Sequence, residues 1–111
     1  MNRPELLQLH DELCAEAKKI MEAKNHDYAG GKHTHEPFAN FTRVESMGIT
    51  TTEKGLLVRM TDKMSRLSTF CQEGEFKVTD ESLRDTILDL INYGILLYGY
   101  TISKDPEQGT K

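Results

Sequence analysis

Apolar residues recur at three- and four-residue spacing in three long segments of the chain, which predicts amphipathic helices. The first runs from about Pro4 to Lys24, and its apolar face carries Leu6, Leu9, Leu13, Ala17 and Ile20. The second runs from about Thr52 to Phe70, and its apolar face carries Leu57, Met60, Met64, Leu67 and Cys71. The third runs from Thr79 or Asp80 to about Ile102.

The pattern fails between residues 25 and 52, where Gly30, Gly31 and Pro37 disfavour a long helix. A short helix from about Phe38 to Met47 is compatible with the spacing of Phe38, Phe41 and Val44. No segment alternates convincingly with a period of two. We therefore predict an all-α protein, a four-helix-type bundle with a long loop between the first and second main helices.

The length of 111 residues predicts one domain spanning residues 1–111. Its core should extend from about residue 4 to residue 102, followed by a flexible polar tail at 103–111. The second half of the last predicted helix is apolar nearly all round, through Leu90, Ile91, Ile95, Leu97 and Tyr98. Such a helix is central to a bundle or lies at a subunit interface, so we expect a homodimer or higher oligomer.

Composition narrows the class of protein. No apolar run approaches 18 residues and the N-terminus lacks a signal-peptide core, so we expect no membrane partner and a cytoplasmic location, in the host cytoplasm if the chain is phage-encoded. The net charge of −4 argues against a nucleic acid polymer as partner. Cys14 and Cys71 are expected to be buried free thiols rather than a disulfide.

An acidic ladder is the most informative feature of the last predicted helix. Glu81, Asp85 and Asp89 recur every fourth residue, a spacing that would place three carboxylates on one stripe of a helix. Like charges at this spacing repel one another, whereas a hard cation such as Mg²⁺ prefers carboxylate oxygens together with substrate phosphates. A solvated polar face near a helix N-terminus is the other reading, and the spacing alone does not decide between them.

Basic residues form a second stripe on the preceding helix, through Arg59, Lys63 and Arg66, with Asp62 among them. A surface salt bridge between Asp62 and Arg66 would explain part of this pattern. If the stripe faces the ladder, Arg59, Lys63 and Arg66 could hold phosphate oxygens and Asp62 could add a metal ligand.

Three further groups of polar residues are candidates for a binding or metal site. Lys24 and Asp27 stand at the predicted end of the first helix, where they favour either a simple helix stop or binding, of phosphate by Lys24 and of a metal or the base by Asp27. Glu12 and Glu16 are more typical of a solvated helix face than of a second carboxylate pair. His33 and His35 lack a third ligand for zinc, so we expect a mobile segment over the site with Gly30 and Gly31 as its hinge.

Four sequence blocks carry a resemblance to a known family. The blocks KNHDYAG, NF, RMTDKMSRL and DESLRDTILDLINYGILL occur in this order within about residues 10–100. They resemble the nucleotide-modification-associated domain family of phages and bacteria. That family is in turn similar to the all-α nucleoside-triphosphate pyrophosphohydrolases, the MazG and dimeric dUTPase group.

The resemblance implies a Mg²⁺ site built on a helix with an EExxD pattern. Asp85 matches the first Glu of that pattern, Asp89 matches its Asp, and Tyr93 matches an aromatic position that follows. Thr86 stands where the second Glu belongs, and Glu12 and Glu16 match the earlier ExxE pattern only with the spacing off by one.

Three hypotheses follow. The first is a Mg²⁺-dependent hydrolase of the all-α pyrophosphohydrolase type that acts on a nucleoside triphosphate or modified nucleotide in phage nucleotide metabolism. In it, Glu81, Asp85 and Asp89 hold the metal with Asp62 and Glu16 as added ligands, cationic side chains clamp the phosphates, and the base or sugar is read by Asp27, Asn92 and Tyr93. The second is a protein that binds or sequesters a nucleotide without turnover, motivated by Thr86. The third is a structural helical dimer.

Overall fold

The structure is a computed structural model that describes residues 1–28 and 36–111, without the side chains of Asp27 and Tyr28. Four α-helices follow one another along the chain: α1 (Arg3–Tyr28), α2 (Ala39–Ser46), α3 (Thr52–Glu73) and α4 (Leu83–Lys104). A short 3₁₀-helix, η1 (Pro106–Thr110), ends it. The described ranges contain helices and no strand, so the predicted all-α class is confirmed.

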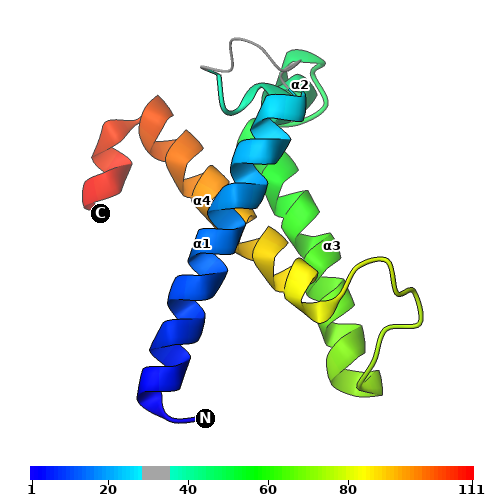
Figure 1. Ribbon diagram of the computed structural model, residues 1–111. Coiled ribbons are helices and arrows are strands. Elements are labelled where there is room, and N and C mark those ends of the chain that lie inside the picture. Colours follow the sequence, from blue (N-terminus) through cyan, green and yellow to red (C-terminus); the bar gives the residue numbers. More distant parts are fainter. Residues whose placement is uncertain (29–35) are drawn as a thin grey trace.

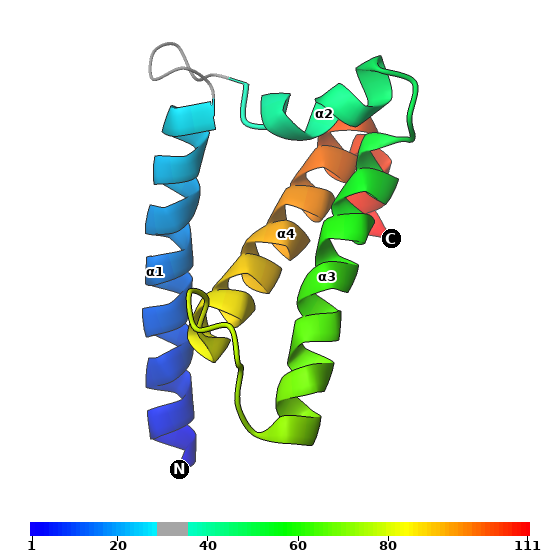
Figure 2. The same cartoon turned by 90° about the vertical axis from the view of Figure 1, so that its right-hand side faces the viewer.

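Helix α4 is the central element. It packs against α1, α3 and η1, whereas α2 packs mainly on α3. Figure 1 shows α4 crossing α1 and α3 obliquely, and in Figure 2 α4 lies between these two helices. Within the described residues, no helix is long and apolar enough to cross a membrane.

Helix α1 is longer than predicted. Its first turn is capped by the Asn2 side chain, whose oxygen accepts from the Glu5 amide at 2.9 Å. The helix continues four residues beyond Lys24, because the side chain of Asn25 donates to the Met21 carbonyl at 3.3 Å instead of turning the backbone out of the helix. Lys24 therefore lies within a helix rather than at its end.

Helices α2 and α3 are joined closely. The Thr51 hydroxyl caps α3 by accepting from the Lys54 amide at 3.2 Å, and Glu45 of α2 accepts from the Thr52 amide at 3.1 Å. Gly55 allows this approach, since a Cβ there would meet the Val44 side chain at 2.9 Å. Gly74 ends α3 with a φ of +78°, a conformation that glycine adopts without strain.

Helix α4 begins at Leu83, later than the predicted start at residue 79 or 80. The reason is a capping box: Ser82 accepts from the Asp85 amide at 3.1 Å, and Asp85 accepts from the Ser82 amide at 3.0 Å. Glu81 consequently lies before the first helical turn. The acidic ladder is therefore not a single helical stripe, and this part of the prediction is wrong.

The C-terminal residues differ from the flexible tail that we predicted. Asp105 caps η1 by accepting from the Glu107 amide at 3.2 Å. The short helix folds back onto α4, where Gly109 lies close to Ile102 and Tyr98.

The buried apolar core is small, and only Ala17, Leu56, Leu88 and Leu96 among the described apolar residues are buried. The predicted apolar face of α3 largely points outward, with Leu57 49% exposed and Met64 56% exposed. The neighbouring charged stripe turns toward α4 instead, because it finds ionic partners there. The two cysteines are free, as predicted, but both are exposed rather than buried.

Candidate functional site

Glu81 lies at the centre of an ionic cluster between α3 and the start of α4. Its Oε1 is 2.6 Å from Lys63 Nζ, and its Oε2 is 2.9 Å from Arg66 Nε. The hydroxyl of Thr86 donates to Oε2 at 2.7 Å. All four side chains are at least partly buried, so the carboxylate is held in one orientation by three donors from two elements.

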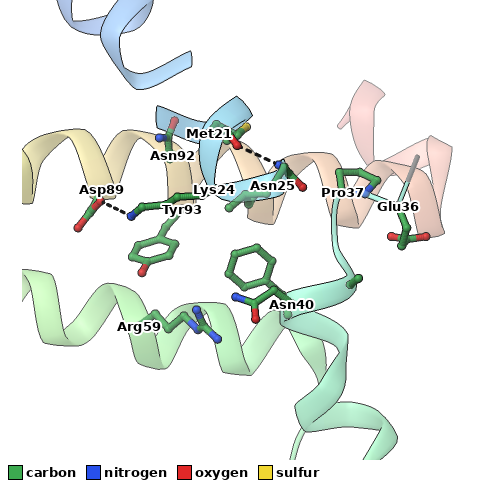
Figure 3. A pocket seen from close by; sticks show the side chains of 13 residues that line it. Met21, Lys24, Asn25, Glu36, Pro37, Asn40, Arg59, Asp89, Asn92 and Tyr93 are labelled. Atoms are coloured by element: carbon green, nitrogen blue, oxygen red, sulfur yellow. Dashed lines mark hydrogen bonds and ion pairs between the residues drawn. The ribbon is translucent and has the colours of Figure 1, made fainter. Parts of the chain in front are cut away.

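Asp89 lies on α4 about one turn after Thr86. It contacts the same cation as Glu81. Its Oδ2 is 2.9 Å from Lys63 Nζ, and its Oδ1 is 3.4 Å from Lys24 Nζ, a contact drawn in Figure 3. The Lys63 ammonium group thus bridges the two carboxylates. Helices α1, α3 and α4 meet at this point, so the basic stripe faces the acidic residues, as predicted, through Lys63 and Arg66.

The other predicted metal ligands lie apart from this pair. Asp85 is exposed and serves the capping box, and Glu16 pairs with Arg84 at 2.5 Å on the surface. Asp62 is exposed beside Arg66 along a shallow depression. Within residues 1–28 and 36–111, no three histidine, cysteine or acidic side chains converge closely enough to share a metal ion.

Arg66 holds the segment between α3 and α4. Its guanidinium donates to the carbonyl of Val78 at 3.3 Å, to the carbonyl of Glu81 and to the Thr86 hydroxyl at 3.3 Å. The same group stacks on Phe76, with its carbon 3.9 Å from the ring centre. Arg66 was predicted to clamp phosphate, and its Nε and Nη2 groups are bound to this segment instead.

Thr86 is completely buried. Its hydroxyl has one proton, which it donates to Glu81 at 2.7 Å, and the Ser82 carbonyl at 3.0 Å is the alternative acceptor. The position at which the resemblance predicts a second Glu is therefore a neutral support for the Glu81 carboxylate rather than a ligand.

A pocket opens beside Asp89, walled by α1, α3, α4 and the segment leading into α2. Its interior measures about 60 Å³, the room of a few water molecules rather than of a nucleoside. In Figure 3, Tyr93 and Arg59 approach it from opposite helices, and Asn40 faces them from α2. Its lining consists of Met21, Lys24, Asn25, Glu36, Pro37, Ala39, Asn40, Phe41, Arg59, Asp89, Asn92, Tyr93 and Leu96.

Four of the predicted ligand-binding residues meet in this lining: Lys24, Arg59, Asn92 and Tyr93. The guanidinium of Arg59 lies 4.7 Å from the centre of the Phe41 ring. Asn92 is 8% exposed; its amide nitrogen donates to the Ala17 carbonyl at 2.9 Å, while its Oδ1 has no hydrogen-bond partner in the described part of the chain.

Sequence reasoning missed the part of the lining supplied by Asn25, Asn40 and Phe41. The NF pair at Asn40 and Phe41 belonged to the family resemblance, and this was the only signal that could have singled it out. The roles predicted for His33, His35 and the Asp27 side chain lie outside the described residues. They stay predictions.

The surroundings of Glu81 shift the pKa values of both members of its closest ion pair. Burial raises the pKa of Glu81, but the hydrogen bonds from Lys63 and Thr86 and the nearby positive charges outweigh it, so the pKa lies below the ordinary 4.5. Burial likewise lowers the pKa of Lys63, but its bonds to Glu81 and Asp89 prevail and leave it above 10.5. Both groups are charged at neutral pH.

Acid is therefore expected to weaken the fold through Glu81. A carboxyl group with a depressed folded-state pKa stabilises the protein fully above its unfolded value near 4.5, and that contribution is lost as the pH falls through the lower folded-state pKa. Urea unfolding measured in steps from pH 7 to pH 3 should show a smaller loss of stability for Glu81→Gln than for the wild type. Identical losses would contradict this assignment.

Comparison with known proteins adds no neighbour from which a role could be transferred. No protein-family model, curated protein or solved structure matches this chain.

Proposed function

We propose that this protein is a Mg²⁺-dependent nucleotide hydrolase of the all-α pyrophosphohydrolase type, acting on a nucleoside triphosphate or modified nucleotide, in keeping with a role in phage nucleotide metabolism. The observation that carries the proposal is the pair of carboxylates bridged by Lys63 at the edge of a pocket that also holds Lys24, Arg59 and Tyr93.

The two carboxylates of Glu81 and Asp89 would supply part of the ligand shell of a magnesium ion. Glu81 and Asp89 each place an oxygen within 3 Å of the Lys63 ammonium, at 2.6 and 2.9 Å, so the two groups already share one cation. Mg²⁺ in proteins is commonly held by one or two carboxylates, with phosphates and water completing its shell. Glu81 and Asp89 would therefore hold the ion together with the substrate, without the other predicted ligands.

A bound Mg²⁺ would neutralise negative charge on the phosphates and make a bound water molecule more acidic. The protein's own contribution is binding and orientation. Lys24 and Arg59 stand at the pocket and can hold phosphate oxygens, and Lys63 can turn from the carboxylates to the phosphate chain. Tyr93 and Phe41 offer aromatic faces to a base, and Asn40 and Asn92 offer amides to its edge.

The small pocket limits how the ligand binds. With about 60 Å³ of interior, it can take an edge of the base or sugar but not a whole nucleoside. The remainder would lie outside, above the partly exposed contact between Lys24 and Asp89.

The proposal is tested by incubating the pure protein with a panel of nucleoside and deoxynucleoside triphosphates, with and without Mg²⁺. We expect release of pyrophosphate or phosphate from at least one of them, only with the metal and above the level of an Asp89→Ala control. No release above that control would contradict hydrolysis.

Nucleotide binding without turnover is the second candidate. Two observations favour it: Thr86 provides no carboxylate, and Glu81 and Asp89 are already neutralised by lysines. Calorimetry that shows tight binding, with the nucleotide recovered unchanged, would select this function over hydrolysis.

A further inference from the structure

The Lys63 ammonium group lies between the two carboxylates of the site and contacts one oxygen of each. Its Nζ is 2.6 Å from Glu81 Oε1 and 2.9 Å from Asp89 Oδ2. The three side chains are at most 24% exposed, so water and salt screen these contacts only weakly. The ammonium group therefore occupies a position where both carboxylates attract a cation at once.

The other oxygen of each carboxylate is engaged by a different cation. Glu81 Oε2 is 2.9 Å from Arg66 Nε. Asp89 Oδ1 is 3.4 Å from Lys24 Nζ. The two oxygens that converge on one point are thus Oε1 of Glu81 and Oδ2 of Asp89, and Lys63 contacts both. A metal ion shared by the two carboxylates would need these same oxygens, and a dication and an ammonium group cannot both stay on them because like charges repel.

The charges around the carboxylates also disfavour a free metal ion. Three cationic side chains, those of Lys24, Lys63 and Arg66, contact the two carboxylates, so the cluster is positively charged overall. Arg59 adds a further positive charge in the lining of the pocket beside Asp89. A free Mg²⁺ ion would increase this positive charge, whereas the magnesium complex of a nucleoside triphosphate is an anion. Electrostatics therefore favour the complex over the ion alone.

Lys63 can reach a phosphate chain that is held at the pocket. It follows Arg59, which lines the pocket, by one turn of α3, so the two side chains are neighbours on the helix surface. The lysine ammonium group is carried by a flexible four-carbon stem. It can therefore move from the carboxylates to a phosphate oxygen without a change in the helices, and this move frees the oxygens of Glu81 and Asp89.

We propose that Lys63 is an internal competitor for the metal ion: it keeps free Mg²⁺ off Glu81 and Asp89, and the phosphate chain of a magnesium–nucleotide complex draws it away. This role rests on the proposed function, because it concerns the same two carboxylates. It adds the form of the ligand that the site accepts, which is the metal–nucleotide complex and not the ion alone. Removal of a lysine with a purely structural role would lower stability without any gain in affinity for metal.

Mn²⁺ is a suitable probe, because it prefers the same oxygen ligands as Mg²⁺ and is detected by electron paramagnetic resonance. Without nucleotide, the wild type should bind Mn²⁺ with a dissociation constant in the millimolar range or above. Lys63→Met should bind it at least about tenfold more tightly. Asp89→Asn introduced into Lys63→Met should remove this gain. If Lys63→Met does not fold, Lys63→Gln, which keeps a donor for one carboxylate, gives the same comparison.

Lys24→Met is the matched control, because Lys24 also contacts Asp89 but at the other oxygen, and its side chain is 49% exposed. It should leave the affinity for Mn²⁺ alone within about threefold of the wild type. Micromolar binding of Mn²⁺ alone by the wild type, equal gains in Lys63→Met and Lys24→Met, or folded Lys63 variants without any gain would each overturn the proposal.

The role of Lys63 and nucleotide hydrolysis can fail separately. If Lys63→Met gains affinity for Mn²⁺ but the wild type hydrolyses no triphosphate, Lys63 excludes the ion and the proposed function is wrong. If the wild type hydrolyses a triphosphate and also binds Mn²⁺ alone at micromolar concentration, the proposed function holds and Lys63 is not a competitor.

Discussion

Asp89→Asn is expected to reduce Mg²⁺-dependent nucleotide hydrolysis at least about a hundredfold, a loss of about 2.7 kcal/mol in transition-state stabilisation. The substitution keeps the shape of the side chain but removes the charge that Lys63 and Lys24 now contact, at 2.9 and 3.4 Å. Only Glu81 would remain to hold a cation at the pocket edge. Steady-state rates at several Mg²⁺ concentrations measure the effect.

Asp85→Asn tests whether hydrolysis depends on the whole acidic ladder or only on the carboxylate pair of Glu81 and Asp89. Asp85 is exposed and bound to Ser82, so its neutralisation should leave the rate within about twofold of the wild type. Equal losses in the two variants would mean that the ladder predicted from the sequence is the functional unit. Circular dichroism of both proteins checks that the helices are retained.

Arg66→Ala is expected to lower the free energy of unfolding by about 2–4 kcal/mol. The guanidinium, 23% exposed, joins α3 to two backbone carbonyls, to Thr86 and to the Glu81 carboxylate. Its removal takes the side-chain donor away from the carbonyls of Val78 and Glu81 and exposes Phe76, on which it stacks, whereas the Glu81 carboxylate keeps its bonds from Lys63 and Thr86. Urea unfolding at neutral pH gives the difference.

Two further substitutions test the reason for this loss. Arg66→Lys keeps the charge but not the planar set of donors, so it should fall between the wild type and Arg66→Ala. Arg84→Ala removes an exposed arginine paired with Glu16 and should cost far less. A loss for Arg84→Ala as large as that for Arg66→Ala would contradict the role given to the buried contacts.

The helices were largely predictable because hydrophobic periodicity is a local property of the chain. Their ends were less so. Whether Asp85 continues a ladder or closes a capping box depends on whether Ser82 leaves the helix, and four-residue spacing does not contain that information. Because Ser82 lies outside the helix as its cap, Glu81 lies before α4 and Asp85 does not join the carboxylate pair.

The face that α3 presents to α4 was harder still to predict. The apolar stripe through Leu57 and Met64 is the usual choice for a core, yet Leu56, Lys63 and Arg66 turn inward. The partners of Lys63 and Arg66 are Glu81, Asp89 and Thr86, which lie 15 to 26 residues away in sequence. The pocket wall from Asn40 and Phe41 is similarly non-local, because it depends on how α2 packs against α3.

The contact of Val44 with Gly55 bears on how the pocket can change size. With α2 held against α3 at van der Waals distance, and with Glu45 bonded to the amide of Thr52, these two helices must move together. Helix α1 packs mainly on α4, through contacts that include the Asn92 bond to Ala17 and the ion pair of Lys24 with Asp89. If the pocket widens to admit a ligand, we therefore expect α1 to tilt relative to α4 while α2 and α3 keep their places relative to each other.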